Sequence, residues 1–102
     1  MYRASDERDN EDYLADLQEA ADRLDLGTEA RSRAADVFLS TLPDEERSKR
    51  AAMAAALYVG ALVAGQQRSQ RRVAAAVGVS RLAVQQRWKD ALQSAGLEPP
   101  DW

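Results

Sequence analysis

The sequence contains neither cysteine nor histidine. Their absence excludes a disulfide framework, a thiolate zinc site, a cysteine nucleophile and the imidazole base of a hydrolytic triad. An acidic cluster, Asp6, Glu7, Asp9, Glu11 and Asp12, lacks the glycine and the ligand spacing of a calcium loop. We therefore predict no enzyme activity, no catalytic residue, no metal site and no cofactor.

Isoleucine is also absent, and 20 of the 102 residues are alanine. Such small apolar residues favour close helix packing over a β-sheet, and a chain of this length forms one domain. The apolar spacing is helical, without strand-like alternation or internal repeats. We predict an all-α domain over residues 10–97, flanked by a flexible charged tail at 1–9 and a C-terminal tail at 98–102.

The sequence has no apolar run long enough for a membrane span. The longest, residues 51–64, has 14 residues, whereas a span needs ~20. Residues 1–9 are charged where a signal peptide has its apolar core. We expect a cytoplasmic, nucleoid-associated protein without a membrane partner, in which this run is a buried core helix.

Five helices are predicted from the apolar stripes and their flanking cap residues. The first begins at the cap Asn10 and ends at Gly27 in a left-handed conformation, and the second runs from the cap Thr28 to Pro43. The third predicted helix, about residues 45–64, is the longest and lies at the centre of the domain. The apolar stripes are Tyr13, Leu14, Leu17, Ala21 and Leu24 in the first helix, and Ala30, Ala34, Val37, Phe38 and Leu42 in the second.

Glycine and serine residues divide the last third of the chain. Gly65 closes the central helix, Ser69 caps a short fourth helix to about Val77, and Gly78 makes a turn to Ser80. Ser80 caps a fifth helix that ends near Gly96. Within the central helix, Gly60 allows close approach of a neighbouring helix.

Acidic residues are scarce in the second half. Residues 1–50 carry 8 basic and 14 acidic side chains, whereas residues 51–102 carry 6 basic and 3 acidic ones. Nine basic and no acidic residues lie between Glu46 and Asp90, namely Arg47, Lys49, Arg50, Arg68, Arg71, Arg72, Arg81, Arg87 and Lys89. This asymmetry indicates a surface that faces a polyanion. The 12 arginines against 2 lysines, with many aspartates, suggest a halophilic host.

Residues 69–92, SQRRVAAAVGVSRLAVQQRWKDAL, have the spacing of a helix-turn-helix. Ala74 lets two helices cross closely, Gly78 provides the turn, and Val84, Trp88 and Leu92 hold the second helix on the core. An ordinary helical hairpin that packs through the same residues is the alternative.

The outer surface of this predicted motif carries side chains suited to DNA. Glutamine pairs with adenine, arginine with guanine, and leucine contacts a thymine methyl. The base-contact candidates are Arg81, Leu82, Gln85 and Gln86. The phosphate-contact candidates are Arg68, Ser69, Gln70, Arg71, Arg72 and Lys89.

Residues 54–92 resemble the end of a cyclin-like repeat of archaeal transcription factor B and its eukaryotic counterpart. Those repeats have an "AAALY" central helix, a Thr/Ser-Gln-Arg-x-x-Ala helix, a Gly-Val turn and a recognition helix that ends in an aromatic-basic pair, here Trp88 and Lys89. The resemblance implies a single five-helix cyclin-like domain with a C-terminal helix-turn-helix, from a haloarchaeal host.

Members of that family recruit RNA polymerase to promoters by binding the TATA-binding protein and DNA. In their second repeat, an apolar residue and an arginine three positions later contact bases; these positions correspond to Leu82 and Gln85, and the glutamine makes an adenine preference possible. The family's zinc ribbon, linker and other repeat are missing, so the chain is a stand-alone regulator or one repeat of a longer protein.

Two functions follow from these observations. The first is a transcription regulator that binds double-stranded DNA and reads it with the fifth helix. The alternative is a protein-interaction module that binds the TATA-binding protein, RNA polymerase or another transcription component without reading DNA. The sequence leaves the oligomeric state open.

Overall fold

The computed structural model describes residues 10–96. They form the helices α2 (Glu11–Arg23), α3 (Thr28–Ser40), α4 (Lys49–Val63), α5 (Gln70–Val77) and α6 (Arg81–Ser94), with a 3₁₀ turn, η1 (Glu46–Ser48). This part of the chain contains no strand, so the predicted all-α fold with five helices is confirmed. The tails predicted at 1–9 and 98–102 lie outside the described residues. Across residues 10–96, every helix is too short or too polar to cross a membrane.

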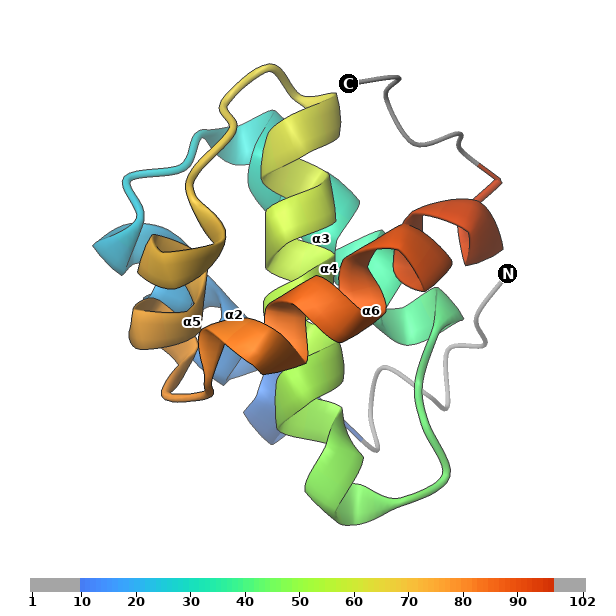
Figure 1. Cartoon of the computed structure of the whole chain (residues 1–102). Helices are drawn as coiled ribbons and strands as arrows, with labels where there is room; N and C mark the ends of the chain where they lie inside the picture. The colour runs from blue at the N-terminus through green and yellow to red at the C-terminus, as the bar shows by residue number, and fades with distance from the viewer. Residues whose placement is uncertain (1–9, 97–102) are drawn as a thin grey trace.

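Helix α4 is the centre of the fold. In Figure 1, α6 crosses in front of it and α3 lies behind it, with α2 and α5 to one side. Its residues 52–61 are all buried, because nearly every face of this segment is apolar and each face meets another helix. At 15 residues α4 is also the longest described helix, as predicted.

Gly60 permits the closest approach between α4 and α3. A Cβ atom at this position would lie 2.7 Å from the Ala30 carbonyl oxygen, 2.7 Å from the Ala34 amide nitrogen and 2.8 Å from the Ala34 Cβ. These distances are shorter than van der Waals contact, and two of the three atoms belong to the α3 backbone. Only glycine fits here without displacing α3, which confirms the predicted role.

The apolar stripes of α2 and α3 face the core as predicted. Leu17, Ala21 and Leu24 of the first stripe are buried, and Tyr13 and Leu14 pack against them in partly buried positions. In the second stripe, four residues, Ala30, Ala34, Val37 and Phe38, are buried, and Leu42 is partly buried. The ring centroids of Tyr13 and Phe38 lie 6.2 Å apart, so the two aromatic side chains connect α2 and α3.

The start of α2 agrees with the prediction, whereas the chain between α2 and α3 does not. Asn10 is the N-cap residue of α2, but its side chain makes no capping hydrogen bond, and its Oδ1 atom accepts a hydrogen bond of 3.0 Å from Lys49 Nζ. Gly27 is extended and precedes α3 as its N-cap. The left-handed residue after α2 is Asp25, with φ 54°. Thr28 is therefore the first residue of α3, not its cap.

The chain between α3 and α4 also differs from the prediction. Helix α3 ends at Ser40, before Pro43, which disfavours a helical conformation in the residue preceding it. Glu45 is extended, and α4 begins at Lys49 after the 3₁₀ turn. Arg47 Nε donates to Glu45 Oε2 over 2.9 Å; residues two apart do not face each other on an α-helix, so this contact belongs to the turn.

The predicted boundaries of α5 and α6 agree closely with the structure. Ser69 Oγ accepts a hydrogen bond of 3.1 Å from the Arg72 amide, and Ser80 Oγ accepts one of 3.1 Å from the Ala83 amide. Gly78, with φ 87°, makes the turn between the two helices. Helix α6 ends at Ser94, and Gly96 follows with φ 81°.

Candidate nucleic-acid interface

Helices α5 and α6 are fixed to the core through their inner faces. Val73, Ala74 and Val77 of α5 are buried, as are the α6 residues Val84, Trp88, Ala91 and Leu92. The Trp88 ring packs edge-on against Tyr58 of α4, with ring centroids 5.2 Å apart. The inward positions predicted for the second helix of the motif are thus the observed ones, and the opposite face of α6 remains exposed to solvent.

The four base-contact candidates lie together on that exposed face. Arg81, Leu82, Gln85 and Gln86 are all exposed, and at about 100° per residue they occupy an arc of about 140° around α6. Leu82 is 55% exposed, and Val63 is the other large apolar side chain exposed within residues 10–96. Arg81 Nη1 donates a hydrogen bond of 2.9 Å to Gln85 Oε1.

The phosphate-contact candidates at the start of α5 are also accessible. Ser69, Arg71 and Arg72 are exposed, and neither arginine side chain has a hydrogen bond or ion pair within residues 10–96. Gln70 is partly buried, and its Oε1 atom is buried without a hydrogen-bond partner there. Since phosphate oxygens accept hydrogen bonds, only the amide nitrogen of Gln70 suits a phosphate.

Arg68 occupies a different environment. Its Nε donates to the Leu24 carbonyl over 2.8 Å and its Nη2 to the Asp25 carbonyl over 3.1 Å. Its Nη1 donates to the carbonyls of Gln66, at 2.8 Å, and Gln67, at 3.4 Å. The guanidinium therefore ties the segment after α2 to the segment after α4. It points to the protein backbone and does not join the exposed arginines of α5.

Lys89 lies on the exposed side of α6, one helical turn after the base-contact candidates. Its Nζ is 5.7 Å from the centroid of the Trp88 ring. A cation at this distance from an indole is attracted to the ring face. The contact holds the Lys89 stem near the protein while the residue stays exposed.

Helix α5 is positioned from both ends. At its C-terminal end, Arg23 of α2 donates from Nη1 to the Ala76 carbonyl over 2.8 Å. At its N-terminal end, Ser69 caps the helix next to the loop that Arg68 anchors. These contacts fix the direction of α5 relative to the α2–α4 core, so the helix that carries the exposed arginines has a defined orientation.

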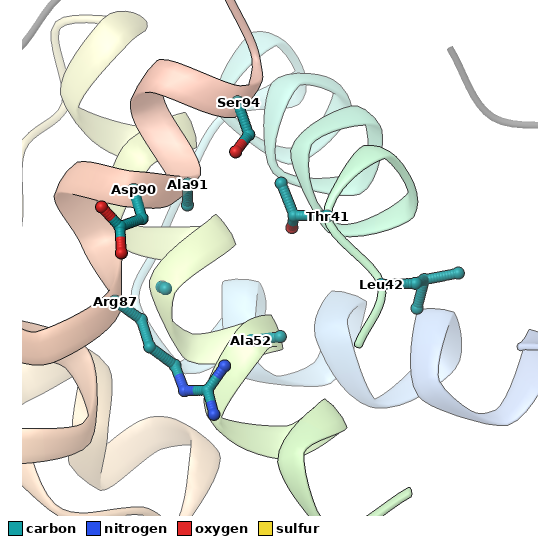
Figure 2. A pocket seen from close by; sticks show the side chains of 8 residues that line it. Thr41, Leu42, Ala52, Arg87, Asp90, Ala91 and Ser94 are labelled. Carbon is teal, nitrogen blue, oxygen red and sulfur yellow. The ribbon is translucent and has the colours of Figure 1, made fainter. Parts of the chain in front are cut away.

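A hollow between α3, α4 and α6 was not predicted from the sequence. Its volume is about 270 Å³, and Figure 2 shows Arg87 extending beside α4 near Ala52, with Thr41 and Ser94 on another side. The lining residues are Thr41, Leu42, Ala52, Ala55, Arg87, Asp90, Ala91 and Ser94. Half-buried Arg87 has no hydrogen bond or ion pair with any described residue.

Arg87 follows Gln86 and is rotated from it by about 100° around α6, so it lies beside α4 at the hollow and not among the base-contact candidates. The sequence signal for it was only its membership of the acid-free basic stretch. The lining residues that follow α3, Thr41 and Leu42, lie 46 and 45 positions earlier in the chain, and no local pattern connects them with Arg87. Among residues 10–96, no group of three or more acidic side chains could hold a metal ion.

Comparison with known proteins gives a consistent result. The family model for the transcription factor TFIIB repeat matches residues 7–94. The chain is 31% identical over 83 residues to transcription initiation factor IIB of Pyrococcus abyssi, which is 78% of this chain and 28% of that protein. It is 32% identical over 78 residues to the factor of Archaeoglobus fulgidus, 74% of this chain and 24% of that protein.

A shorter alignment, with transcription initiation factor IIB of Pyrodictium occultum, has 40% identity over 47 residues, 46% of this chain and 15% of that protein. The chain thus spans about a quarter of the length of the relatives that it matches over most of its own length.

Proposed function

The chain belongs to the transcription factor TFIIB repeat family, and we propose that it is a transcription regulator that binds duplex DNA through α5 and α6. Membership of this family agrees with the five-helix cyclin-like fold predicted from the sequence. The predicted haloarchaeal host stays a prediction.

The observation that supports the proposal is that no arginine or lysine of α5 and α6 forms an ion pair within residues 10–96. Arg71 and Arg72 are exposed and have no acidic partner among the described residues, and Asp90 is the only acidic residue in these two helices. Exposed cations without acidic neighbours favour a polyanion, because release of counterions from DNA contributes to binding. The exposed face of α6 then offers side chains of the types that contact base edges.

Roles can be assigned along this surface. Ser69, Gln70, Arg71, Arg72 and Lys89 contact phosphates, with the amide nitrogen of Gln70 as its donor. Arg81, Leu82, Gln85 and Gln86 enter the major groove, where Leu82 reaches a thymine methyl. Arg68 is left out of this set, because its donors are bound to four backbone carbonyls.

The test is an electrophoretic mobility shift with a random-sequence duplex at about 50 mM and about 200 mM salt. If the cations Arg71, Arg72 and Lys89 each neutralise one phosphate, the fourfold rise in salt weakens binding by roughly 40-fold. No binding at the lower salt concentration contradicts the proposal.

Two pairs of variants distinguish the proposed phosphate contacts from the proposed base contacts. Arg71→Ala weakens binding to all sequences about equally, whereas Arg33→Ala, the same change at an exposed residue of α3, leaves binding unchanged. Gln85→Ala relaxes sequence preference, whereas Gln93→Ala, at an exposed residue near the end of α6, does not. Equal effects within either pair contradict the assigned roles.

The hollow beside Arg87 favours a second candidate function, a protein-interaction module. A half-buried guanidinium without a partner inside residues 10–96 suits a carboxylate of another protein. Titration calorimetry with the host's purified TATA-binding protein, and with RNA polymerase, tests this function. Loss of binding in Arg87→Ala but not in Arg33→Ala supports it, and unchanged binding in Arg87→Ala contradicts it. A chain that binds these proteins but no duplex DNA has the second function alone.

A further inference from the structure

One hydrogen bond lies in the middle of the proposed base-reading surface. Arg81 Nη1 and Gln85 Oε1 are 2.9 Å apart, one helical turn from each other, and both residues are exposed. Ser80 caps the helix just before Arg81, and this cap stabilises the first turn of α6, from which Arg81 projects. The two side chains therefore form a defined unit on the surface.

The chemistry of the pair fixes which end of the Gln85 amide faces outward. Arginine has five N–H donors and no acceptor, so only the oxygen of the amide can face it. The amide nitrogen, with its two N–H donors, is left on the side away from Arg81. The remaining N–H groups of the guanidinium are donors as well. The pair as a whole thus presents donors and a positive charge to an approaching base.

This arrangement distinguishes guanine from adenine. Glutamine reads adenine by accepting from the N6 amino group while it donates to N7, but here the accepting oxygen is already bound to a cation. An adenine amino group brought to that oxygen also meets the guanidinium, which places donor against donor. Guanine instead offers two neighbouring acceptors, N7 and O6, and both match the donors of the pair.

We propose that Arg81 and Gln85 act as one unit that selects guanine over adenine at one position of the bound duplex. This inference rests on the DNA binding proposed above and reverses the adenine preference that the sequence suggests for Gln85 alone. Arg81 makes the direct contact to the guanine edge. Gln85 holds the guanidinium in place through its oxygen and adds its own N–H donor.

The experiment is a selection from a randomised duplex library with the purified wild-type chain, Arg81→Ala, Gln85→Ala and the control Gln93→Ala. Circular dichroism of each variant checks that its helix content is preserved. Two duplexes that differ only by G·C or A·T at the selected position are then titrated with each protein.

The expected result has three parts. The wild type and Gln93→Ala select guanine and bind the G·C duplex about tenfold more tightly, the effect of one good bidentate contact. Arg81→Ala frees the amide oxygen of Gln85, so its preference shifts to adenine. Gln85→Ala keeps guanine with lower stringency, because arginine alone can pair with guanine.

Two outcomes overturn the inference while DNA binding stands: a wild-type chain that selects adenine or no base at this position, or an Arg81→Ala variant that still selects guanine. A wild-type chain that retains no duplex from the library at low salt overturns the proposed function itself, and this inference with it.

Discussion

The helices α2 and α3 and the helices α5 and α6 use their charged residues in different ways. In the first region, taken together with the start of α4, three basic side chains have acidic partners: Arg31 pairs with Asp22, Lys49 with Glu46 and Arg50 with Asp16. Arg23 donates instead to the Ala76 carbonyl, and Arg33 forms no such bond among the described residues. In α5 and α6, as far as the structure describes them, no arginine or lysine forms such a pair. Apart from Arg33, the basic side chains of the first region connect parts of the protein, whereas those of the second form no ion pair in the described structure and remain available to a partner.

Arg68 shows that the position of a basic residue in the sequence does not determine whether its side chain is bound within the protein or available to a partner. It stands one residue before the cap of α5, inside the basic stretch, yet its guanidinium is bound to carbonyls after α2 and α4. Its role is that of the first region. The two regions therefore differ in what their charged side chains contact, and single substitutions can test each of these contacts.

The largest effect is expected where the two regions share α4. Gly60→Ala places a Cβ 2.7 Å from backbone atoms of α3, so α3 must shift, at a cost of about 3 kcal/mol in unfolding free energy. Chemical denaturation measures this cost. Because α6 packs on another face of α4, hydrogen exchange is expected to accelerate in α3 and α6 together. If hydrogen exchange accelerates in α3 alone, the two regions unfold independently, which contradicts a single folding unit.

The next effect concerns Arg68. Arg68→Ala removes the donors of four backbone carbonyls and is expected to lower the unfolding free energy by about 2 kcal/mol, since some of these carbonyls regain water. Arg33→Ala, at an exposed residue without such bonds, is the control and changes stability by less than about 0.5 kcal/mol. If Arg68→Ala is as stable as this control but binds DNA more weakly, Arg68 belongs with the unpaired charges of α5 and α6.

A smaller effect, on binding and not on stability, is expected from the double variant Arg71→Ala, Arg72→Ala. Its unfolding free energy stays within about 0.5 kcal/mol of the wild type, because neither side chain has a partner in the described structure. Its DNA binding weakens about tenfold, and the slope of log affinity against log salt falls by about 2. Loss of stability without a change of slope contradicts the difference between the two regions.

The sequence predicted the elements that depend on local signals. The serine caps and glycine turns of α5 and α6 were found because each signal acts within one helical turn. The side-chain role of Asn10 and the conformation of Gly27 were wrong in the prediction because their contacts are distant: Asn10 accepts from Lys49, and the Gly27 amide donates to Gln66 Oε1 over 2.8 Å. Such contacts, which also determine the role of Arg68 and the hollow around Arg87, exist only after folding.

The smallest effect concerns a contact of the first region, between α2 and the turn before α4. Tyr13 donates its hydroxyl to Glu46 Oε1 over 3.0 Å. This bond is the main cause that lowers the pKa of Glu46 below 4.5 and raises the pKa of Tyr13 above 10.0. Lys49 also lowers the pKa of Glu46.

The sign of the pH dependence follows from these two shifts. The carboxylate's contribution to stability is present above pH 4.5 and is lost as the pH falls through the lowered pKa of Glu46. The phenol's contribution is present below pH 10.0 and is lost as the pH rises through the raised pKa of Tyr13. The contribution is small because both groups are near the surface.

The variant Tyr13→Phe separates the contributions of Tyr13 and Lys49 to the lowered pKa of Glu46. In this variant the pKa of Glu46, measured by NMR titration of its carboxyl carbon, rises towards 4.5 but stays below it, because the bond with Lys49 remains. An unchanged pKa shows that Lys49 alone holds the carboxylate and that Tyr13 does not connect α2 to the turn. The matched change Tyr58→Phe, at a phenol that accepts from Gln67 far from Glu46, leaves the pKa of Glu46 unaltered, so a rise in Tyr13→Phe alone assigns the effect to this contact.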